Sequence, residues 1–216
     1  MVHVSNQILT GETAHEYLSS GEYVAYEELA PKKRADWLVG RMAAKQAIVD
    51  EIYRRTGRTV SWQDVEIVSG KKEKPTFRLL ASSETLIPEE YSLTLSHTAG
   101  QAVAALSFIR ESGFVGVDIE RERICSNDFS KAFLTEREFQ SYIETGLLSP
   151  LSLWCYKEAF LKALGTGLRA HPRMIEMTLD DQGELVRIEK DGLEVSFRAE
   201  KLAFPGVPFG AIVYLT

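Results

Sequence analysis

The sequence has few cysteines, no long apolar run and no excess of basic residues. Its two thiols, Cys125 and Cys155, lie in neither a CxxC pattern nor a spacing with histidine, which excludes a disulfide framework and a structural zinc site and favours a reducing cytoplasm. No stretch approaches the roughly 18 consecutive apolar residues of a membrane helix, and the first residues carry acids where a secretion signal is basic and then apolar. We therefore expect a cytoplasmic protein without a membrane partner.

The charge and composition exclude further classes of protein. The formal net charge is -6, which argues against a nucleic-acid binder that works by bulk electrostatics. Hydrophobic residues make up 44% of the chain and charged residues 26%, which are the values of a folded globular protein rather than of a disordered one. No Pro-, Gly- or Ser-rich linker separates independent modules.

Hydrophobic periodicity predicts a chain of alternating helices and strands. A long amphipathic helix with a basic face is expected over 35–55, and Gly57 ends it. Further helices are expected over 135–144 and 151–164. Strands are expected over 65–68, 76–80, 92–96, 102–109, 114–120, 176–179, 185–189, 193–199 and 211–215, with the polar turn 110–113 joining the fourth and the fifth.

A long helix followed by a strand meander occurs twice in this order. The sequence therefore predicts an α+β fold of two similar α/β halves, residues 1–109 and 110–216, in each of which a long helix packs on a meander. Residue identity between the halves is negligible, so internal duplication is a hypothesis that rests on the order of elements alone.

Two carboxylates alternate on one expected strand, in Gly116-Val117-Asp118-Ile119-Glu120. Asp118 and Glu120 are at i and i+2, so they point to the same face. Two adjacent anions repel each other unless a cation lies between them, and a hard divalent cation such as Mg²⁺ takes oxygen ligands. The alternative is a strand end whose acids face water.

A second group lies on the expected helix 151–164. Glu158 and Lys162 are at i and i+4, so they share one helix face, while Trp154 and Phe160 are assigned to the core. Such a pair alone is usually a surface ion pair. Together with Asp118 and Glu120, the pair becomes different: Glu158 adds a third carboxylate for a metal, and Lys162 adds a cation for a phosphate.

The first half contributes a candidate anion site. Ser96 and His97 lie where a strand ends in a turn of small residues, and a hydroxyl, an imidazole and nearby amides suit an anion. Additional cations are Arg41, Lys45 and Lys74. The alternatives are a structural histidine and a solvated basic face.

On these motifs the sequence resembles the 4'-phosphopantetheinyl transferases of the long, surfactin-synthetase type. The motifs are R-x-x-x-K at 41–45, K-P at 74–75, L-S-H-T at 95–98, G-V-D-I-E at 116–120 and W-x-x-K-E-x-x-x-K-x-x-G-x-G-L at 154–168. The resemblance implies two halves related by a pseudo-twofold axis. It also implies an enzyme that transfers the phosphopantetheine arm of coenzyme A to a serine of an apo acyl or peptidyl carrier protein and releases 3',5'-ADP. Glu73 departs from the glycine that is common before the Lys-Pro pair.

The resemblance implies roles for the candidate residues. Mg²⁺ would be held by Asp118, Glu120 and Glu158, and Lys162 would neutralise the pyrophosphate or the leaving group. Glu158, directly or through a metal-bound water, would take the serine proton. The coenzyme A ligands besides Lys162 would be Arg41, Lys45, Ser96 and His97 at the adenosine 3'-phosphate and Lys74 beside the nucleotide.

Two other functions remain open from the sequence: a coenzyme A or carrier-protein binding module without activity, and a Mg²⁺-dependent phosphohydrolase. Because the chain contains two halves, we expect its site to form within one chain and a monomer to suffice. The carrier protein and its pathway cannot be named from the sequence.

Overall fold

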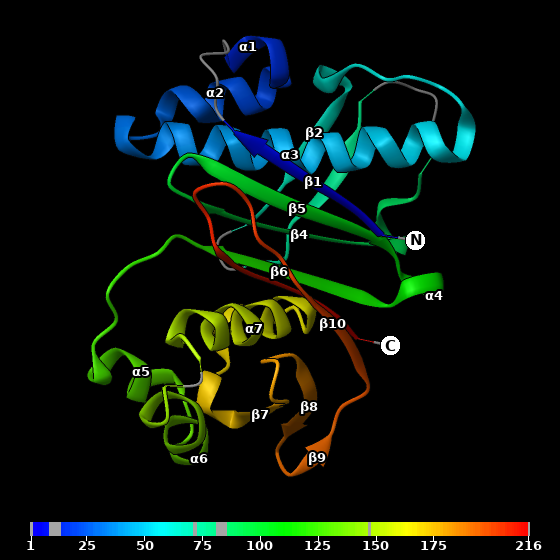
Figure 1. Ribbon diagram of the computed structural model, residues 1–216. Helices are drawn as coiled ribbons and strands as arrows, with labels where there is room; N and C mark the ends of the chain where they lie inside the picture. The colour runs from blue at the N-terminus through cyan, green and yellow to red at the C-terminus, as the bar shows by residue number, and fades with distance from the viewer. Residues whose placement is uncertain (1, 9–13, 71–72, 81–85, 147, 216) are drawn as a thin grey trace. The chain divides into compact units, whose positions relative to one another are not determined.

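The computed structural model describes residues 2–8, 14–70, 73–80, 86–146 and 148–215 (Figure 1). The chain divides into two compact units, Met1–Phe114 and Val115–Thr216, here called unit 1 and unit 2. The sequence placed this boundary between residues 109 and 110. Helices and strands are mixed in both units, so the expected α+β class is confirmed.

Unit 1 begins with a strand that the sequence analysis did not predict. Its helices are α1 (Ala14–Tyr17), α2 (Ser20–Glu28), α3 (Pro31–Thr56) and α4 (Ile109–Ser112), with the 3₁₀ turns η1 (Trp62–Asp64) and η2 (Pro88–Glu90). Its strands are β1 (Val2–Ile8), β2 (Val65–Val68), β3 (Thr76–Leu79), β4 (Tyr91–Thr98) and β5 (Gln101–Phe108).

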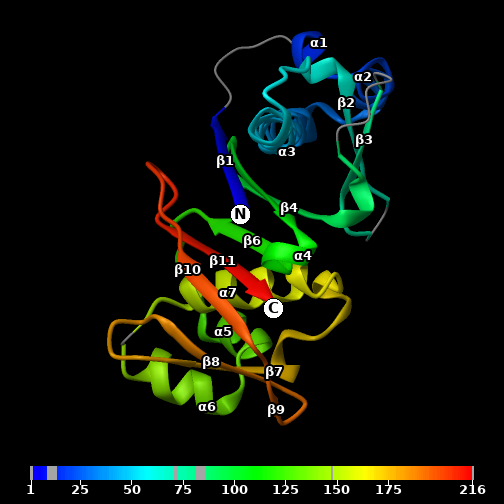
Figure 2. The ribbon, with the colours of Figure 1, turned by 90° about the vertical axis from the view of Figure 1, so that its right-hand side faces the viewer.

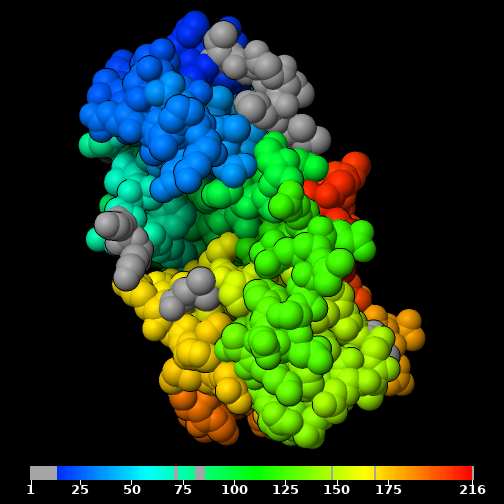
Figure 3. All heavy atoms as spheres, turned by 90° about the vertical axis from the view of Figure 1, so that its left-hand side faces the viewer, coloured from blue at the N-terminus to red at the C-terminus, as the bar shows by residue number. Residues whose placement is uncertain are grey.

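The long helix α3 packs on the sheet of unit 1. Pro31 occupies its first turn, where no amide hydrogen bond is lost, and Gly57 ends it with a φ of 69°. The sheet has the order β1-β5-β4, antiparallel throughout, and β2 pairs with β3 in a separate hairpin. Figure 2 shows α3 beside the β1-β5-β4 sheet, and Figure 3 shows α2 and the first turns of α3, in blue, at the surface of unit 1. The core between helix and sheet includes Val39, Ala43, Ile48, Leu93 and Leu106.

Unit 2 also begins with a strand. Its helices are α5 (Asn127–Phe133), α6 (Glu136–Glu138), the π-helical turn η3 (Phe139–Glu144), α7 (Pro150–Ala163) and the 3₁₀ turns η4 (Gly167–Arg169) and η5 (Pro172–Met174). Its strands are β6 (Phe114–Glu120), β7 (Ile175–Leu179), β8 (Leu185–Lys190), β9 (Leu193–Glu194), β10 (Phe197–Lys201) and β11 (Phe209–Leu215).

The sheets of the two units have the same order. In unit 1 the first strand, β1, pairs with the last strand, β5, which pairs with the strand before it, β4. In unit 2 the first strand, β6, pairs with the last strand, β11, which pairs with β10. The long helix packs on the sheet in each case, α3 on β5 and α7 on β11. This repeat agrees with two halves of one architecture.

The connection between the units differs from the prediction. Residues 102–109 and 114–120 were expected to form a hairpin through a turn at 110–113. Residues 109–112 instead form α4, which ends at Gly113 with a φ of 68°. β5 pairs with β1 and β4, whereas β6 pairs with β11. The expectation was wrong because antiparallel strands that are adjacent in the sequence need not pair when each has a partner from its own unit.

One smaller difference concerns the strands of unit 2. The strand expected over 193–199 is divided into β9 and β10. No helix within the described ranges has both the length and the apolar character needed to cross a membrane.

Candidate functional site

Strand β6 presents its two carboxylates towards helix α7. Gly116, Asp118 and Glu120 alternate along the strand, so they share one face. A Cβ atom on Gly116 would lie 1.8 Å from the carbonyl oxygen of Ala159, so only glycine allows the strand to approach α7 so closely. Asp118 is only 5% exposed, which rules out a strand end whose acids simply face water.

Lys162 joins the strand to the helix. Its ammonium donates to Asp118 Oδ1 at 2.7 Å and to the carbonyl oxygen of Val117 at 3.1 Å. Glu158 Oε2 is 3.9 Å from the same nitrogen. The predicted pair at i and i+4 is therefore present, but the closer carboxylate comes from β6.

The electrostatics of this cluster reflect burial and crowded charges. Burial, followed by the charges of Asp118 and Glu120, raises the pKa of Glu158, although Lys162 opposes the shift. Burial and Asp118 likewise raise the pKa of Glu120. Burial disfavours the charge of Lys162, but Asp118 and Glu158 outweigh it and raise the pKa of this ammonium. The cluster thus holds a protonated lysine among three acids.

The donor chemistry of the cluster fits a hard divalent cation. Among the described residues, no three His, Cys, Asp or Glu side chains already stand together as metal ligands. In this arrangement Lys162 supplies the positive charge between Asp118 and Glu158. The three carboxylates nevertheless offer only oxygen donors, and burial, together with the charge of Asp118, raises the pKa of both Glu120 and Glu158.

Two residues outside the predicted set orient Glu120. Trp154 Nε1 donates to Glu120 Oε1 at 3.1 Å, and Arg123 lies 3.6 Å from the same oxygen. The Trp154 ring packs on Phe129 and Phe133, and the Arg123 guanidinium stacks over Phe129. Trp154 was expected to lie in the core alone, and its position one helical turn before Glu158 was the signal for a polar role. Phe160 is fully buried in the core of unit 2, as predicted.

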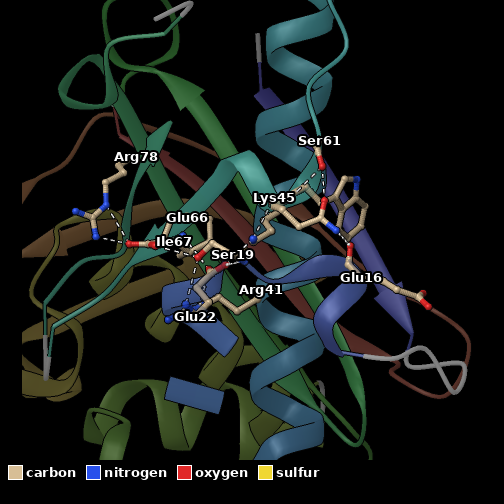
Figure 4. A network of polar contacts seen from close by, with 11 residues as sticks. Glu16, Ser19, Glu22, Arg41, Lys45, Ser61, Glu66, Ile67 and Arg78 are labelled. Atoms are coloured by element: carbon tan, nitrogen blue, oxygen red, sulfur yellow. Dashed lines mark hydrogen bonds and ion pairs between the residues drawn. The ribbon is translucent and has the colours of Figure 1, made fainter. Parts of the chain in front are cut away.

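In unit 1, Arg41 and Lys45 lie one turn apart on α3 but differ in surroundings (Figure 4). Arg41 stacks on Trp37 and donates to Ser69 Oγ at 2.9 Å. Lys45 is fully buried: its ammonium lies 2.5 Å from Glu22 Oε2 and donates to the carbonyl oxygen of Trp62 at 2.8 Å. As placed, Lys45 has no exposed surface for a phosphate.

Ser96 and His97 are neighbours on β4 and point to opposite faces. Ser96 is buried. His97 is exposed, with Nδ1 4.0 Å from Asp36 Oδ2 and its ring close to Gly40 of α3. The expected pairing of hydroxyl and imidazole around one anion is therefore not preformed.

Lys74 lies beside the same strand. Its ammonium donates to Ser92 Oγ at 2.8 Å and is 5.0 Å from the centre of the Phe114 ring. Ser92 and Ser96 share one face of β4, so Lys74 is on the Ser96 side. Burial lowers the pKa of Lys74 to about 8.

Comparisons with known proteins connect this chain to one family, and the family model matches the segment that forms most of unit 2. Residues 114–209 match the model of the 4'-phosphopantetheinyl transferase superfamily. A holo-[acyl-carrier-protein] synthase of Geobacillus kaustophilus is 37% identical over 40% of this chain and 64% of its own length, just under two thirds. One of Bacillus subtilis is 31% identical over 42% of this chain and 74% of its own length. A solved structure of the Helicobacter pylori holo-[acyl-carrier-protein] synthase in complex with coenzyme A is 21% identical, covering 49% of this chain and 97% of that one, with a TM-score of 0.38.

The matched segment contains the whole carboxylate–lysine cluster. Asp118 and Glu120 lie at its beginning, and Glu158 and Lys162 lie near its middle. The similarity to the Bacillus subtilis relative extends over nearly three quarters of that protein. The chain therefore belongs to the 4'-phosphopantetheinyl transferase superfamily.

Proposed function

We propose that this protein transfers the 4'-phosphopantetheine arm of coenzyme A to a serine hydroxyl of an apo acyl or peptidyl carrier protein and releases 3',5'-ADP. One observation carries the proposal: Lys162 is bound to Asp118 and lies beside Glu158, within the segment that matches the superfamily. The named relatives are holo-[acyl-carrier-protein] synthases.

The reaction needs charge neutralisation and a proton acceptor. Coenzyme A has a densely anionic pyrophosphate, and a serine hydroxyl is a weak nucleophile. Lys162 is charged and a quarter of its side chain is exposed, so it neutralises a pyrophosphate oxygen or the leaving group. Glu158 has a raised pKa and is the candidate acceptor of the serine proton, directly or through a water.

Asp118, Glu120 and Glu158 would hold Mg²⁺. The ion, when bound, supplies positive charge at the pyrophosphate oxygens. The chain's own contribution is orientation: Trp154 and Arg123 fix Glu120, and the contact of Gly116 with α7 fixes the distance between strand and helix.

The side chains of unit 1 would bind the nucleotide end of coenzyme A. Arg41 and His97 would contact the 3'-phosphate, with Ser96 on the same strand, and Lys74 would flank the nucleotide. Membership of the long, surfactin-synthetase type is favoured by the same strand order in both units. A monomeric state and a cytoplasmic location stay predictions.

Mass spectrometry of the carrier protein tests the proposal. A purified apo acyl carrier protein and a purified apo peptidyl carrier protein are each incubated with the protein, coenzyme A and Mg²⁺. We expect at least one of the two carriers to gain the mass of one phosphopantetheine. A carrier whose acceptor serine is replaced by alanine serves as the control and gains nothing. Cleavage of coenzyme A without a carrier product would identify a phosphohydrolase, and binding without cleavage would identify a binding module; either result contradicts the proposal.

A further inference from the structure

A buried glutamate in unit 1 gathers three elements (Figure 4). Glu22 is the third residue of α2, and it forms a capping box with Ser19. Its Oε1 accepts the amide hydrogen of Ile67 in β2 at 3.0 Å, and its Oε2 lies 2.5 Å from Lys45 Nζ in α3. Lys45 also donates to the carbonyl oxygen of Trp62. Helix α2, helix α3 and strand β2 are thus joined through one ion pair.

Unit 2 contains the same arrangement. Glu138 is the third residue of α6 and forms a capping box with Thr135. Its Oε1 accepts the amide hydrogen of Met177 in β7 at 2.9 Å, and its Oε2 lies 2.7 Å from Lys157 Nζ in α7. Lys157 also donates to the carbonyl oxygens of Pro172 and Ile175.

The two arrangements agree position by position. Ile67 and Met177 are each the third residue of their strands, which begin at Val65 and Ile175. The carbonyl of Trp62 precedes β2 by three residues, as the carbonyl of Pro172 precedes β7.

The burial agrees as well. Both lysines are fully buried, and Glu22 and Glu138 are at most 4% exposed. Because a capping box, a strand amide, a lysine and a carbonyl all recur, chance similarity does not account for the match.

We propose that Glu22–Lys45 and Glu138–Lys157 are two copies of one structural lock, and that Lys45 acts in unit 1 as a positioning residue rather than as a ligand of the coenzyme A phosphate. The residue that each lock positions lies on the same long helix. In unit 2 it is Glu158, which directly follows Lys157. In unit 1 it is Arg41, one turn before Lys45; this second half of the inference rests on the proposed function.

The lock acts on Arg41 through the negative charge of Glu22. Arg41 Nε is 3.6 Å from Glu22 Oε1, so Glu22 serves two cations at once. Burial lowers the pKa of both Arg41 and Lys45, and Glu22 opposes the shift in each case. The ammonium of Lys45 is bound by Glu22 and by the carbonyl oxygen of Trp62. Of the two cations Arg41 and Lys45, Arg41 is therefore the one that reaches the surface, with 11% of its side chain exposed.

Paired substitutions test the lock without reference to activity. Glu22→Gln leaves Lys45 buried without its counter-ion, and Lys45→Met removes the closer of the two cations beside Glu22. Each substitution should lower the apparent Tm by about 10 °C. The double variant E22Q/K45M removes both charges and should recover at least half of that loss. Glu138→Gln, Lys157→Met and their double variant should behave in the same way.

The crossed double variant E22Q/K157M is the matched control, because it combines partners from different locks and should show no recovery. Additive losses in E22Q/K45M, or recovery in the crossed variant, would overturn the lock. These measurements do not depend on whether the protein transfers phosphopantetheine.

A substrate comparison tests the positioning role. Dephospho-coenzyme A lacks the 3'-phosphate, so the ratio of kcat/KM for coenzyme A to that for dephospho-coenzyme A measures recognition of this group. Arg41→Met should reduce the ratio about tenfold. The variant E22Q/K45M keeps Arg41 but loses the carboxylate beside it, so its ratio should fall by a smaller factor of about threefold, and an unchanged ratio would contradict the positioning role. A folded E22Q/K45M variant that loses the preference as fully as Arg41→Met would overturn the assignment of Lys45. Absence of transfer by the wild type would instead count against the proposed function.

Discussion

Burial decides what each lysine of this protein can do. Lys162 has a quarter of its side chain exposed and is surrounded by acids, so it keeps its charge at a surface that an anion can reach. Lys45 and Lys157 are just as strongly paired but fully buried, so their charge acts within the fold. Lys74 has a hydroxyl and an aromatic ring beside it, and burial lowers its pKa to about 8.

Asp118→Asn should abolish transfer while leaving the fold intact. The substitution keeps the shape of the side chain but removes a candidate metal ligand and the closest partner of Lys162, so we expect kcat/KM to fall by at least about 100-fold. The thermal midpoint should change little, because the loss of an ion pair is offset by relief of repulsion from Glu120 and Glu158. Initial rates of carrier modification and thermal unfolding measure the two effects. The exposed Asp128→Asn is the control, and full activity of Asp118→Asn at saturating Mg²⁺ would refute the assignment.

Lys74 should give coenzyme A recognition a dependence on pH. Because burial lowers its pKa to about 8, the ammonium loses its proton above that pH and no longer attracts a phosphate. For the wild type, kcat/KM for coenzyme A should therefore decline above about pH 8. Lys74→Met should have a lower kcat/KM at neutral pH and should lack this decline, while Lys201→Met, an exposed control, should retain it. An identical decline in Lys74→Met would assign the titration to another group.

At the scale of elements, β6 and α7 form one platform for the chemistry. The strand supplies Asp118 and Glu120 at every second residue, and the helix supplies Glu158 and Lys162 one turn apart. These two patterns meet only because the backbone at Gly116 touches the backbone of α7. The distance between the acids and the lysine is therefore set by a residue without a side chain.

Gly116→Ala should disturb both the stability and the chemistry of unit 2. The added methyl group would lie 1.8 Å from the carbonyl oxygen of Ala159 and 2.5 Å from the amide nitrogen of Ala163, so backbone must move. We expect a loss of stability of about 3 kcal/mol, as for other overpacked sites, and a clear fall in kcat. Gly40→Ala on α3 is the control, because its methyl group would meet Leu95 at 3.6 Å and the His97 ring at 4.0 Å, which are ordinary contacts. Denaturant unfolding and carrier modification rates decide the outcome, and a Gly116→Ala variant as stable and active as the control would contradict the close approach.

The sequence predicts those elements best whose signal is local. The bounds of β2 and β6 agree with the expected strands because apolar alternation marks both ends. β1 was missed because Val2–Ile8 is rich in polar residues, and its strand pairing with β5 is a long-range contact. The capping box that begins at Ser19 was readable as S-x-x-E but was not used.

The same distinction holds for the candidate site. The common face of Asp118 and Glu120 follows from a period of two and could be predicted. The contact between Lys162 and Asp118 depends on the packing of α7 on the sheet and could not. Lys45 looked like part of a basic helix face, because its partner Glu22 is 23 positions earlier in the sequence and no local pattern connects them.

At the scale of the whole molecule, two units share one architecture but carry different chemistry. The lock lysines Lys45 and Lys157 provide the reference for comparing α3 with α7. Glu158 follows Lys157, whereas Gln46 follows Lys45. Five residues after each lock lysine stand Lys162 in unit 2 and Asp50 in unit 1, where Gln46 donates to Asp50. The first strand of unit 1, Val2–Ile8, contains no acid to match Asp118 or Glu120.

Coenzyme A should therefore bind once per chain, despite the repeated fold. Within the described part of the chain, the cluster of carboxylates and a partly exposed lysine that suits a pyrophosphate lies in unit 2, so isothermal titration with Mg²⁺ present should give a stoichiometry of one. Arg41→Met should weaken the affinity about tenfold without changing the stoichiometry, since a lost phosphate contact alters strength rather than number. Lys32→Met, which removes an exposed cation at the start of the same helix, controls for general charge effects. Two equivalent sites per chain would mean that unit 1 binds the pyrophosphate without these carboxylates, and the assignment of distinct roles to the two units would then be wrong.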